Sequence, residues 1–505
     1  MESASIAQPE PPSAAPQPAL KAGAIGFLSN IVISVASVAP AYSLAATLGY
    51  IAAVQGLGYH APATIIIAFF PMIAIAAAYY WMNRADPDCG TAFSWVTKAM
   101  GPVMGWQTGW AIVVADVLVM PSLADVAGNY TFQLFGVTPS TPEVVAVGIA
   151  WIIIMTAICY VGIEVSARLQ QGLLTLEFVT LVVFAVVALI KVYANHPAHS
   201  IPVSADWFNP FSAPLGALVN GILLAIFIYW GWDSGVSVNE ETEDPGDSPG
   251  RSALISNVVL IAIYLLVSVA VQSYGGLDNL VKNSADVFAP LGKGVLGSGL
   301  DKILIIAVLS SASASTQTTI LPTARTTLSM GRVGAVPKQF ATIHPRFLSP
   351  GFSTIWMGTM SMLVYILLSA TSHKNLIADA FTSLSLTIAF YYGITGYACV
   401  IYYRKHIFDS VRNFFLLGVV PLAGGVFLTF ILVKAVISYS AKDGGYARPF
   451  LGIGSPVAIA LLTVILGIAA MLIQRFWMPR FFTETKREVV DPAIVASAPA
   501  GRAAA

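Results

Sequence analysis

Four carboxylate side chains each stand inside a long apolar stretch of the sequence: Asp116, Asp125, Glu177 and Asp233. If these stretches cross a bilayer, each charged group costs about 2.5–3.5 kcal/mol or more at the helix centre. Such a group needs a function or a partner. A carboxylate at that depth can bind a cation or exchange a proton, and pairing inside the helix bundle is the simpler alternative.

Other kinds of chemistry lack the residues that they need. The six histidines fall at the edges of the apolar stretches or between them, and no nucleophile motif follows a strand pattern, so hydrolase chemistry has no basis. Cys89, Cys159 and Cys399 match no metal-ligand spacing and are interpreted as reduced and structural. The formal net charge is zero, without a dense basic run, which excludes nucleic acid as a partner. We predict no cofactor and no metal centre apart from a possible coupling ion, H⁺ or Na⁺.

Two apolar stretches are interrupted where a simple membrane helix would continue. The first contains Ser37-Val38-Ala39-Pro40, in which the proline lacks a backbone donor and its ring clashes with the preceding turn. The other has Gly231 and Gly235 on either side of Asp233. Irregular backbone at membrane depth is tolerated where it is buried in protein or lines a polar cavity.

These interruptions fall in the first and sixth stretches, which correspond to each other if ten stretches form two inverted repeats of five. Such a pair points to the binding site of a transporter, although two ordinary kinks are the alternative. The N-termini of half-helices suit a carboxylate and freed carbonyls suit an ammonium, which favours a zwitterion or an amine. The residues predicted to contact the substrate are Ser37, Val38, Ala39, Asp116, Phe227, Trp230, Gly231, Trp232 and Asp233.

The elements that must position these residues are membrane helices. Of 505 residues, 57% are hydrophobic and 10% charged, whereas soluble domains carry about 25% charged residues. A bilayer core needs about 20 apolar residues per helix. We predict an all-α polytopic membrane protein of about twelve helices, near residues 25–54, 61–82, 104–128, 143–163, 169–193, 215–241, 253–274, 300–329, 353–371, 376–403, 413–437 and 454–477.

The distribution of Lys and Arg predicts the orientation. Most of these residues fall on one side if both termini are cytoplasmic, as the positive-inside rule requires, and the expected location is the cell membrane. Residues 1–22 and 482–505 are rich in Ala and Pro and are predicted to be disordered cytoplasmic tails around a transporter domain of residues 23–481. Most Trp and Tyr side chains are expected in the interfacial belts.

Three motifs resemble the amino acid-polyamine-organocation superfamily of permeases. Phe227-Ile228-Tyr229-Trp230-Gly231-Trp232-Asp233, then Glu240-Glu241 and Pro245 through Pro249, is similar to that family's F-x-Y-x-G-F-D, E-E, P and P pattern. Pro87-Asp88-Cys89-Gly90-Thr91-Ala92-Phe93 resembles its P-x-x-G-G-x-Y signature, with Thr91 and Phe93 departing from Gly and Tyr. The segment from Ala324-Arg325 to His344-Pro345 looks like the family's loop after the eighth helix.

Together the matches cover roughly residues 25–405, in the family's order. The resemblance implies a leucine-transporter-type fold, with two inverted repeats of five helices plus two more. One departure is that Ser37-Val38-Ala39-Pro40 replaces the family's Gly-Ser-Gly-like segment in the first helix.

The resemblance also bears on ion coupling. Glu177 falls where proton-coupled relatives carry a lysine, so the sign of the charge is reversed. Ala312, Ser315 and Thr316 have i, i+3, i+4 spacing, which places a carbonyl and two hydroxyls on one helix face, similar to the sodium site of this fold. Proton and sodium coupling both stay open, with the proton favoured because a buried carboxylic acid can exchange it directly. Helix packing is the alternative role of these residues.

The predicted function is secondary active transport of an amino acid or a small amine by alternating access. The alternatives are a sensor or accessory protein with the permease fold, an uncoupled exchanger and, more distantly, a membrane-embedded enzyme. The predicted partners are a small-molecule substrate and the lipid bilayer. No oligomeric state is predicted.

Overall fold

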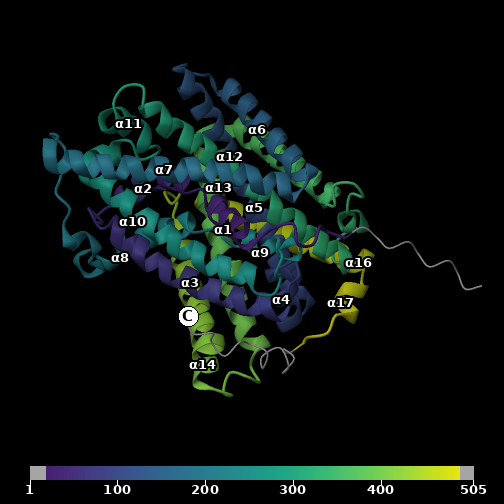
Figure 1. Ribbon diagram of the computed structural model, residues 1–505. Coiled ribbons are helices and arrows are strands. Elements are labelled where there is room, and N and C mark those ends of the chain that lie inside the picture. The colour runs from purple at the N-terminus through teal and green to yellow at the C-terminus, as the bar shows by residue number, and fades with distance from the viewer. Residues whose placement is uncertain (1–18, 489–505) are drawn as a thin grey trace, which may run out of the picture.

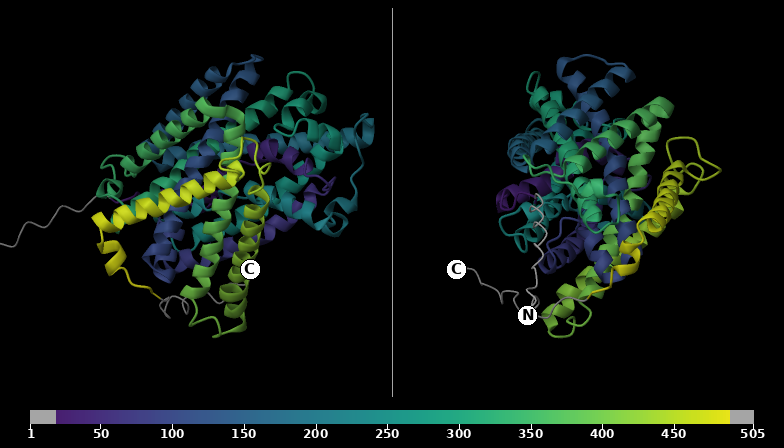
Figure 2. Two further views of the ribbon diagram at one scale, coloured as in Figure 1. Left: turned by 180° about the vertical axis from the view of Figure 1, so that it is seen from behind. Right: turned by 90° about the vertical axis from the view of Figure 1, so that its right-hand side faces the viewer.

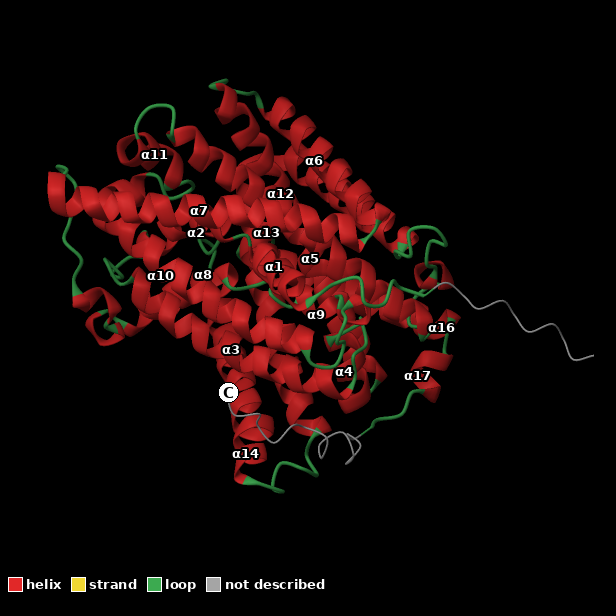
Figure 3. Cartoon of the chain, viewed as in Figure 1, coloured by secondary structure: helices red, strands yellow, loops and turns green. Residues whose placement is uncertain are grey.

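The computed structural model describes residues 19–488, apart from the side chains of residues 372–374. Helices joined by short loops make up this part of the chain, and no strand is assigned in it (Figure 3). Eleven helices are long and apolar enough to cross a membrane, and the shorter apolar helix Leu215–Ile228 lies where the sixth span was predicted. The prediction of an all-α polytopic protein of about twelve spans is confirmed.

The spans follow one another in a recurring order. The first five comprise the broken pair α1 and α2, then α3, the short α4 before α5, α6 and α7. The next five comprise the broken pair α8 and α9, then α10, the short α11 before α12, and two spans within α13, Gly351–Thr371 and Asn375–Tyr402. Because the first half crosses the membrane five times, the second half begins on the opposite side of the membrane. This is the order of two inverted repeats.

The helices have the following bounds: α1 Phe27–Val38, α2 Pro40–Ala52, α3 Ala61–Ala85, α4 Ala92–Met100, α5 Pro102–Phe135, α6 Thr141–Val161, α7 Ile163–Asn195, α8 Leu215–Ile228, α9 Ser234–Ser237, α10 Ser248–Lys282, α11 Phe288–Leu296, α12 Asp301–Arg332, α13 Gly351–Tyr402, α14 Val411–Asn413, α15 Val420–Tyr439, α16 Ser455–Trp477 and α17 Arg480–Glu484. Short 3-10 turns cover Ala205–Phe208, Pro210–Ser212, Asn239–Glu241 and Lys338–Ala341, and a π-helical turn covers Phe414–Val419.

The first break occurs where the sequence predicts it. Ala39 adopts the left-handed conformation, with φ 51° and ψ 67°, and separates α1 from α2. Pro40 then takes the first position of α2. A backbone N–H at this position would have no acceptor within the helix, so its absence in proline costs nothing. The proline therefore starts a new half-helix instead of bending a continuous one.

The second break covers residues 229–233, between α8 and α9. Gly231 has φ 116°, a conformation that side chains rarely tolerate, and a Cβ there would lie 2.9 Å from the carbonyl oxygen of Ser37. The hydroxyls of Ser37 and Ser234 are 2.7 Å apart. The two breaks therefore touch each other, at the centre of the bundle where α1 and α9 lie (Figure 1).

The last two spans lie at the periphery. α15 packs on α3 and α13, and α16 packs on α5 and α13. Figure 2 shows α16 running across the outside of the bundle. These helices support the ten-helix core and contribute no residue to the meeting point of the breaks.

Both predicted tails are folded at their inner ends. Leu20 is buried against Cys89 and Leu328, and Lys21 forms an ion pair of 2.8 Å with Glu164. At the other end, the N–H of Glu488 donates to the carbonyl oxygen of Lys98. The inner ends of the two predicted tails thus contact the transporter domain, and the boundaries of tails and domain stay a prediction. Residues 1–18 and 489–505 lie outside the described residues.

Candidate functional site

A small enclosed cavity of about 10 Å³ lies where the two breaks meet. It is called the central cavity below. Polar groups from α1, α5, α12, α13 and the second break surround it. Its lining consists of Ser37, Ile112, Asp116, Trp230, Gly231, Asp233, Ser234, Thr319, Pro322 and Tyr391.

Asp233 is held in place by two neighbouring tyrosines of α13. The hydroxyl of Tyr392 donates to its Oδ1 at 2.8 Å and that of Tyr391 to its Oδ2 at 3.2 Å. Trp230 in turn donates its indole N–H to the hydroxyl of Tyr391. Because the three aromatic side chains are buried, the carboxylate keeps a fixed position at the wall of the central cavity.

Asp116 reaches the same cavity from α5. The hydroxyl of Thr323 donates to its Oδ2 at 2.5 Å, and the residue is 3% exposed. Among the described side chains that line the central cavity, two are carboxylates and none is Lys, Arg or His. Two carboxyl groups in one small cavity favour a positively charged occupant, because a cation lowers the cost of ionising them.

The N-terminus of α2 is occupied by the protein's own groups. The N–H of Ala41 donates to Glu177 Oε1 at 2.7 Å, and the N–H of Tyr42 donates to Ser311 Oγ at 3.2 Å. The N–H groups of Ala39 and Ser43 donate to backbone carbonyls. Since Pro40 has no N–H, every backbone donor from residue 39 to residue 43 has an acceptor within the protein.

Glu177 therefore caps a half-helix, and it does so next to α12. Its Oε1 also accepts a hydrogen bond from Ser311 Oγ at 2.9 Å, whereas its Oε2 is buried without a hydrogen-bond partner. The positive end of the α2 dipole stabilises a carboxylate at this place. The structure thus brings Glu177 to the middle of α12, as the sequence predicted.

The predicted sodium ligands on α12 are used differently from one another. Ser315 Oγ donates to the carbonyl oxygen of Ser37 at 2.9 Å and so contacts the first break. Thr316 Oγ1 donates to the carbonyl oxygen of Ala312 at 2.9 Å, within its own helix. Ala312, Ser315 and Thr316 are all buried, and their part in ion binding stays a prediction.

Five of the nine predicted substrate contacts line the central cavity, namely Ser37, Asp116, Trp230, Gly231 and Asp233. The other four do not. Val38 and Ala39 form the turn of the first break, and Trp232 packs between Tyr79 and Tyr392. Phe227 lies against Phe381, with ring centroids 3.9 Å apart, and next to Trp230. In the second break, Trp230, Gly231 and Asp233 face the cavity whereas Trp232 faces the surrounding helices, a division that hydropathy does not reveal.

Sequence reasoning missed Tyr391, Tyr392, Ser311 and Thr323. The signal for the first two was present, since two adjacent tyrosines in the middle of a predicted span are far from either interface. These two tyrosines, like Tyr79 and Tyr264, are buried in the core and do not face lipid. Ser311 and Thr323 stand in a Ser/Thr-rich helix, where nothing in the sequence distinguishes them from packing residues.

Charged side chains are paired at the end of the bundle that carries the motif loops. This end is called the closed end. Arg325 donates to Glu241 at 2.6 Å with both side chains buried, and Arg332 donates to both oxygens of Glu240. These pairs tie α12 to the turn that follows α9. These paired motif residues therefore hold the helices together here, and they do not line the central cavity.

The three cysteines are free and buried, in keeping with a structural role. Cys89 lies at the closed end, with its thiol within 4.8 Å of possible ligand atoms of Asp88 and Glu240. Burial raises the pKa of the Cys89 thiol well above its usual value, so the thiol stays protonated. Asp88 accepts from Gly90, Ser94 and Ser329, and Glu240 binds Arg332, so these carboxylates already have partners.

The fold and the site agree with what this chain resembles among known proteins. A family model for amino acid permeases matches residues 25–479, which is most of the chain. The chain therefore belongs to this family, within the amino acid-polyamine-organocation superfamily, and is a membrane transporter and not an enzyme.

Individual relatives are distant. An uncharacterized transporter of Mycobacterium tuberculosis is 27% identical, covering 83% of this chain and 88% of the relative. A low-affinity putrescine importer of Escherichia coli is 23% identical, covering 66% and 74%. A branched-chain amino acid permease of Bacillus subtilis is also 23% identical, covering 73% and 78%.

Proposed function

We propose that this permease carries a small protonated amine across the cell membrane by alternating access, driven by a cation gradient. One observation carries the choice of substrate. Asp116 and Asp233 line the central cavity, while the N-terminal donors of α2 are bonded to Glu177 and Ser311. An ammonium group in the cavity would meet two carboxylates and stabilise both.

A substrate carboxylate would fit less well in the same place. It would bring a third negative charge next to Asp116 and Asp233, and like charges at close range are costly in a medium of low dielectric constant. The N-terminus of α2 cannot offset that cost unless Glu177 leaves Ala41. A protonated amine without a carboxylate avoids both costs.

The relatives support two substrate classes. The Escherichia coli relative is named a putrescine importer, and putrescine is a diamine. The Bacillus subtilis relative is named a branched-chain amino acid permease, which makes an amino acid the second candidate. The two carboxylates of the central cavity favour the amine.

For coupling, we propose Glu177 as the group that responds to the cation. Its Oε2 is buried without a hydrogen-bond partner, so a proton or a sodium ion there would relieve an uncompensated polar atom. Release of that cation would change the charge at the N-terminus of α2 and so alter the first break. The proton is favoured, since Thr316 and the Ala312 carbonyl are already bonded to each other.

The expected orientation places both termini and the closed end in the cytoplasm, in line with the positions of Lys and Arg. Labelling of the single variants Asp443→Cys and Arg346→Cys with a membrane-impermeant thiol reagent tests this. The cysteine at position 443 should react from outside intact cells, and the cysteine at position 346 should react only after permeabilisation. The reverse pattern would overturn the orientation.

Uptake into proteoliposomes tests the function. Labelled 1,4-diaminobutane is offered with a pH gradient or a sodium gradient imposed separately, for the wild type, Glu177→Gln and the exposed control Glu484→Gln. We expect gradient-driven uptake in the wild type and the control, and its loss in Glu177→Gln. Flux indifferent to both gradients would show an exchanger or facilitator, and binding without flux would show a sensor.

A further inference from the structure

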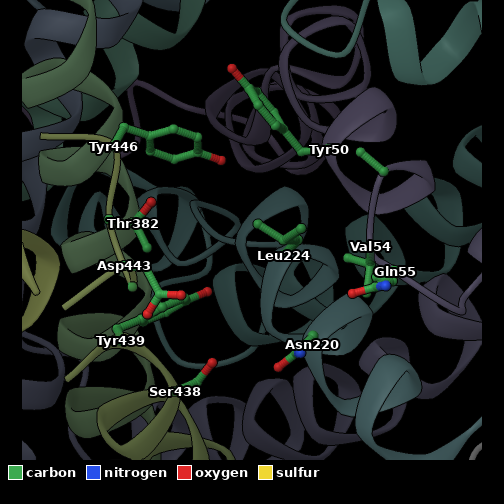
Figure 4. Close-up of a pocket in the computed structure, with 13 residues that line it drawn as sticks. Tyr50, Val54, Gln55, Asn220, Leu224, Thr382, Ser438, Tyr439, Asp443 and Tyr446 are labelled. Atoms are coloured by element: carbon green, nitrogen blue, oxygen red, sulfur yellow. The ribbon is translucent and has the colours of Figure 1, made fainter. Parts of the chain in front are cut away.

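Two adjoining cavities open at the end of the bundle opposite the closed end. The first, of about 470 Å³, lies between the end of α2, the middle of α8, α13 and the loop after α15 (Figure 4). The second, of about 330 Å³, lies between α2, α5, the loop before α11 and α13. They share Tyr50, Leu224, Thr382 and Tyr446. Together they are called the vestibule.

The vestibule lies farther along the same path as the central cavity. Asp125 lines it and is nine residues beyond Asp116 on α5, or about 13 Å at 1.5 Å per residue. Phe381 lines the vestibule, packs on Phe227 at 3.9 Å between ring centroids, and Phe227 contacts Trp230 of the central cavity. The aromatic pair therefore separates the two compartments.

The charge of the vestibule has one sign. Asp443 lines its first cavity, and Asp125 and Asp286 line the second. Among the described side chains that line either cavity, none is Lys, Arg or His. In Figure 4 the carboxylate of Asp443 lies beside Tyr439, with Leu224 and Asn220 across the cavity. A positively charged molecule is attracted to such a surface.

The loop that carries Asp443 and Tyr446 is fixed in place over the vestibule. Asp379, which is fully buried on α13, accepts hydrogen bonds from the N–H groups of Tyr446 and Ala447 at 2.8 and 2.7 Å. It also accepts one from Ser455 Oγ at 2.5 Å, at the start of α16. One carboxylate thus holds both ends of this part of the loop, so specific hydrogen bonds fix this wall of the vestibule.

Two further features suit an organic ammonium. Tyr50 and Tyr446 form an edge-to-face pair with centroids 5.9 Å apart where the cavities join, and tyrosine rings attract cations. Thr47 lines the second cavity, is fully buried, and its hydroxyl has no hydrogen-bond partner in the protein. Burial raises the pKa of the nearby Asp286, a cost that a bound cation would offset.

We propose that the vestibule is a second binding site, which holds a protonated amine before it passes Phe227 and Phe381 into the central cavity. The class of ligand rests on the proposed function, but the residues are different ones. Asp443 and the two carboxylates of the second cavity supply the charge. Tyr50 and Tyr446 supply the aromatic surface.

Equilibrium binding of labelled 1,4-diaminobutane to the purified full-length protein at low salt tests the proposal. We expect two sites per chain in the wild type and one in the double variant Asp443→Asn, Asp125→Asn. Asp278→Asn is the matched control, because Asp278 is an exposed carboxylate on α10 that lines neither cavity. It should keep two sites. A parallel competition assay with sodium distinguishes an amine site from an inorganic ion site. Sodium that fully displaces the amine from the weaker site at equal concentration would overturn the proposal.

Uptake gives a second readout that does not depend on folding of the double variant. In Asp443→Asn alone, we expect the KM for the amine to rise about three- to fivefold at low salt with kcat unchanged, and the difference to vanish at high salt. One site per chain, together with an unchanged KM, would overturn the vestibule proposal while the central site stands. A failure of the proposed function looks different, because then Asp233→Asn would leave both binding and uptake unchanged.

Discussion

The two helix breaks meet at one point, yet their polar groups have different partners. At the break between α1 and α2, the backbone donors are bonded to Glu177, Ser311 and main-chain carbonyls. At the break between α8 and α9, Asp233 is held by tyrosines and faces the central cavity. One break is thus closed by an internal carboxyl group, and the other has a carboxyl group that faces the central cavity.

This difference teaches that a broken helix does not by itself define what binds at it. An open N-terminus attracts an anion, and here the protein supplies that anion from α7. In the proposed function, a change in the charge of Glu177 alters the backbone of the first break, and the second break recognises the substrate. The following variants test this division, from the largest expected effect to the smallest.

The largest effect is expected at the anchor of the second break. Arg325→Met leaves Glu241 as a buried charge without its partner, which should lower the free energy of unfolding by about 3–5 kcal/mol. Thermal unfolding in detergent measures this. The double variant Arg325→Met, Glu241→Gln should recover most of the loss, because no uncompensated charge is left. A single variant as stable as the wild type would show that the ion pair does not anchor the turn after α9.

The next effect concerns the cap of the first break. Glu177→Ala removes the acceptor of the Ala41 N–H and of the Ser311 hydroxyl, which should cost about 2–3 kcal/mol in unfolding free energy. Glu177→Gln keeps an oxygen acceptor and should lose less than half as much. Equal losses in the two variants would argue that packing, and not the cap, accounts for the stability. Thermal unfolding of both variants in the same detergent decides between these results.

An effect on binding rather than on stability is expected at the second break. Asp233→Asn keeps an acceptor for Tyr392 but loses the charge, so amine affinity should fall about 10- to 100-fold, or about 1.4–2.7 kcal/mol. Isothermal titration of 1,4-diaminobutane measures this, with Glu484→Gln as the exposed control. Affinity that falls in Glu177→Gln and not in Asp233→Asn would reverse the roles of the two breaks.

The smallest effect is expected at the contact between the breaks. Ser37→Ala and Ser234→Ala each remove one partner of a hydroxyl pair, and a double-mutant cycle should give a coupling of about 0.5–1.5 kcal/mol in amine binding. Coupling near zero would mean that the two breaks act independently. The binding constants of the four proteins supply the cycle.

The fold could be predicted because its causes are local in the sequence. Apolar runs of spanning length set the helices, and Pro40 and Gly231 mark the two breaks, since each residue restricts or frees the backbone in a known way. The site could be predicted in part for the same reason, since Asp116, Glu177 and Asp233 are conspicuous charges in apolar surroundings.

The remaining features depend on contacts between distant segments. Glu177 can cap α2 only because α7 passes beside the first break. The two residues joined by this hydrogen bond, Glu177 and Ala41, are 136 residues apart in the sequence. Asp379, Asp443 and Tyr446 come together through a loop after α15 that has no sequence pattern of its own. Nothing in local periodicity encodes such pairings.

The central claim is that the cavity between the breaks selects an ammonium without a carboxylate. Two matched pairs test it most directly, 1,4-diaminobutane with ornithine and isobutylamine with valine, because the members of each pair differ by one carboxylate. Competition against labelled substrate in proteoliposomes should show each amine binding at least about tenfold more tightly than its amino acid, a difference of about 1.4 kcal/mol. Amino acids that compete as well as their amines, or better, would contradict the account.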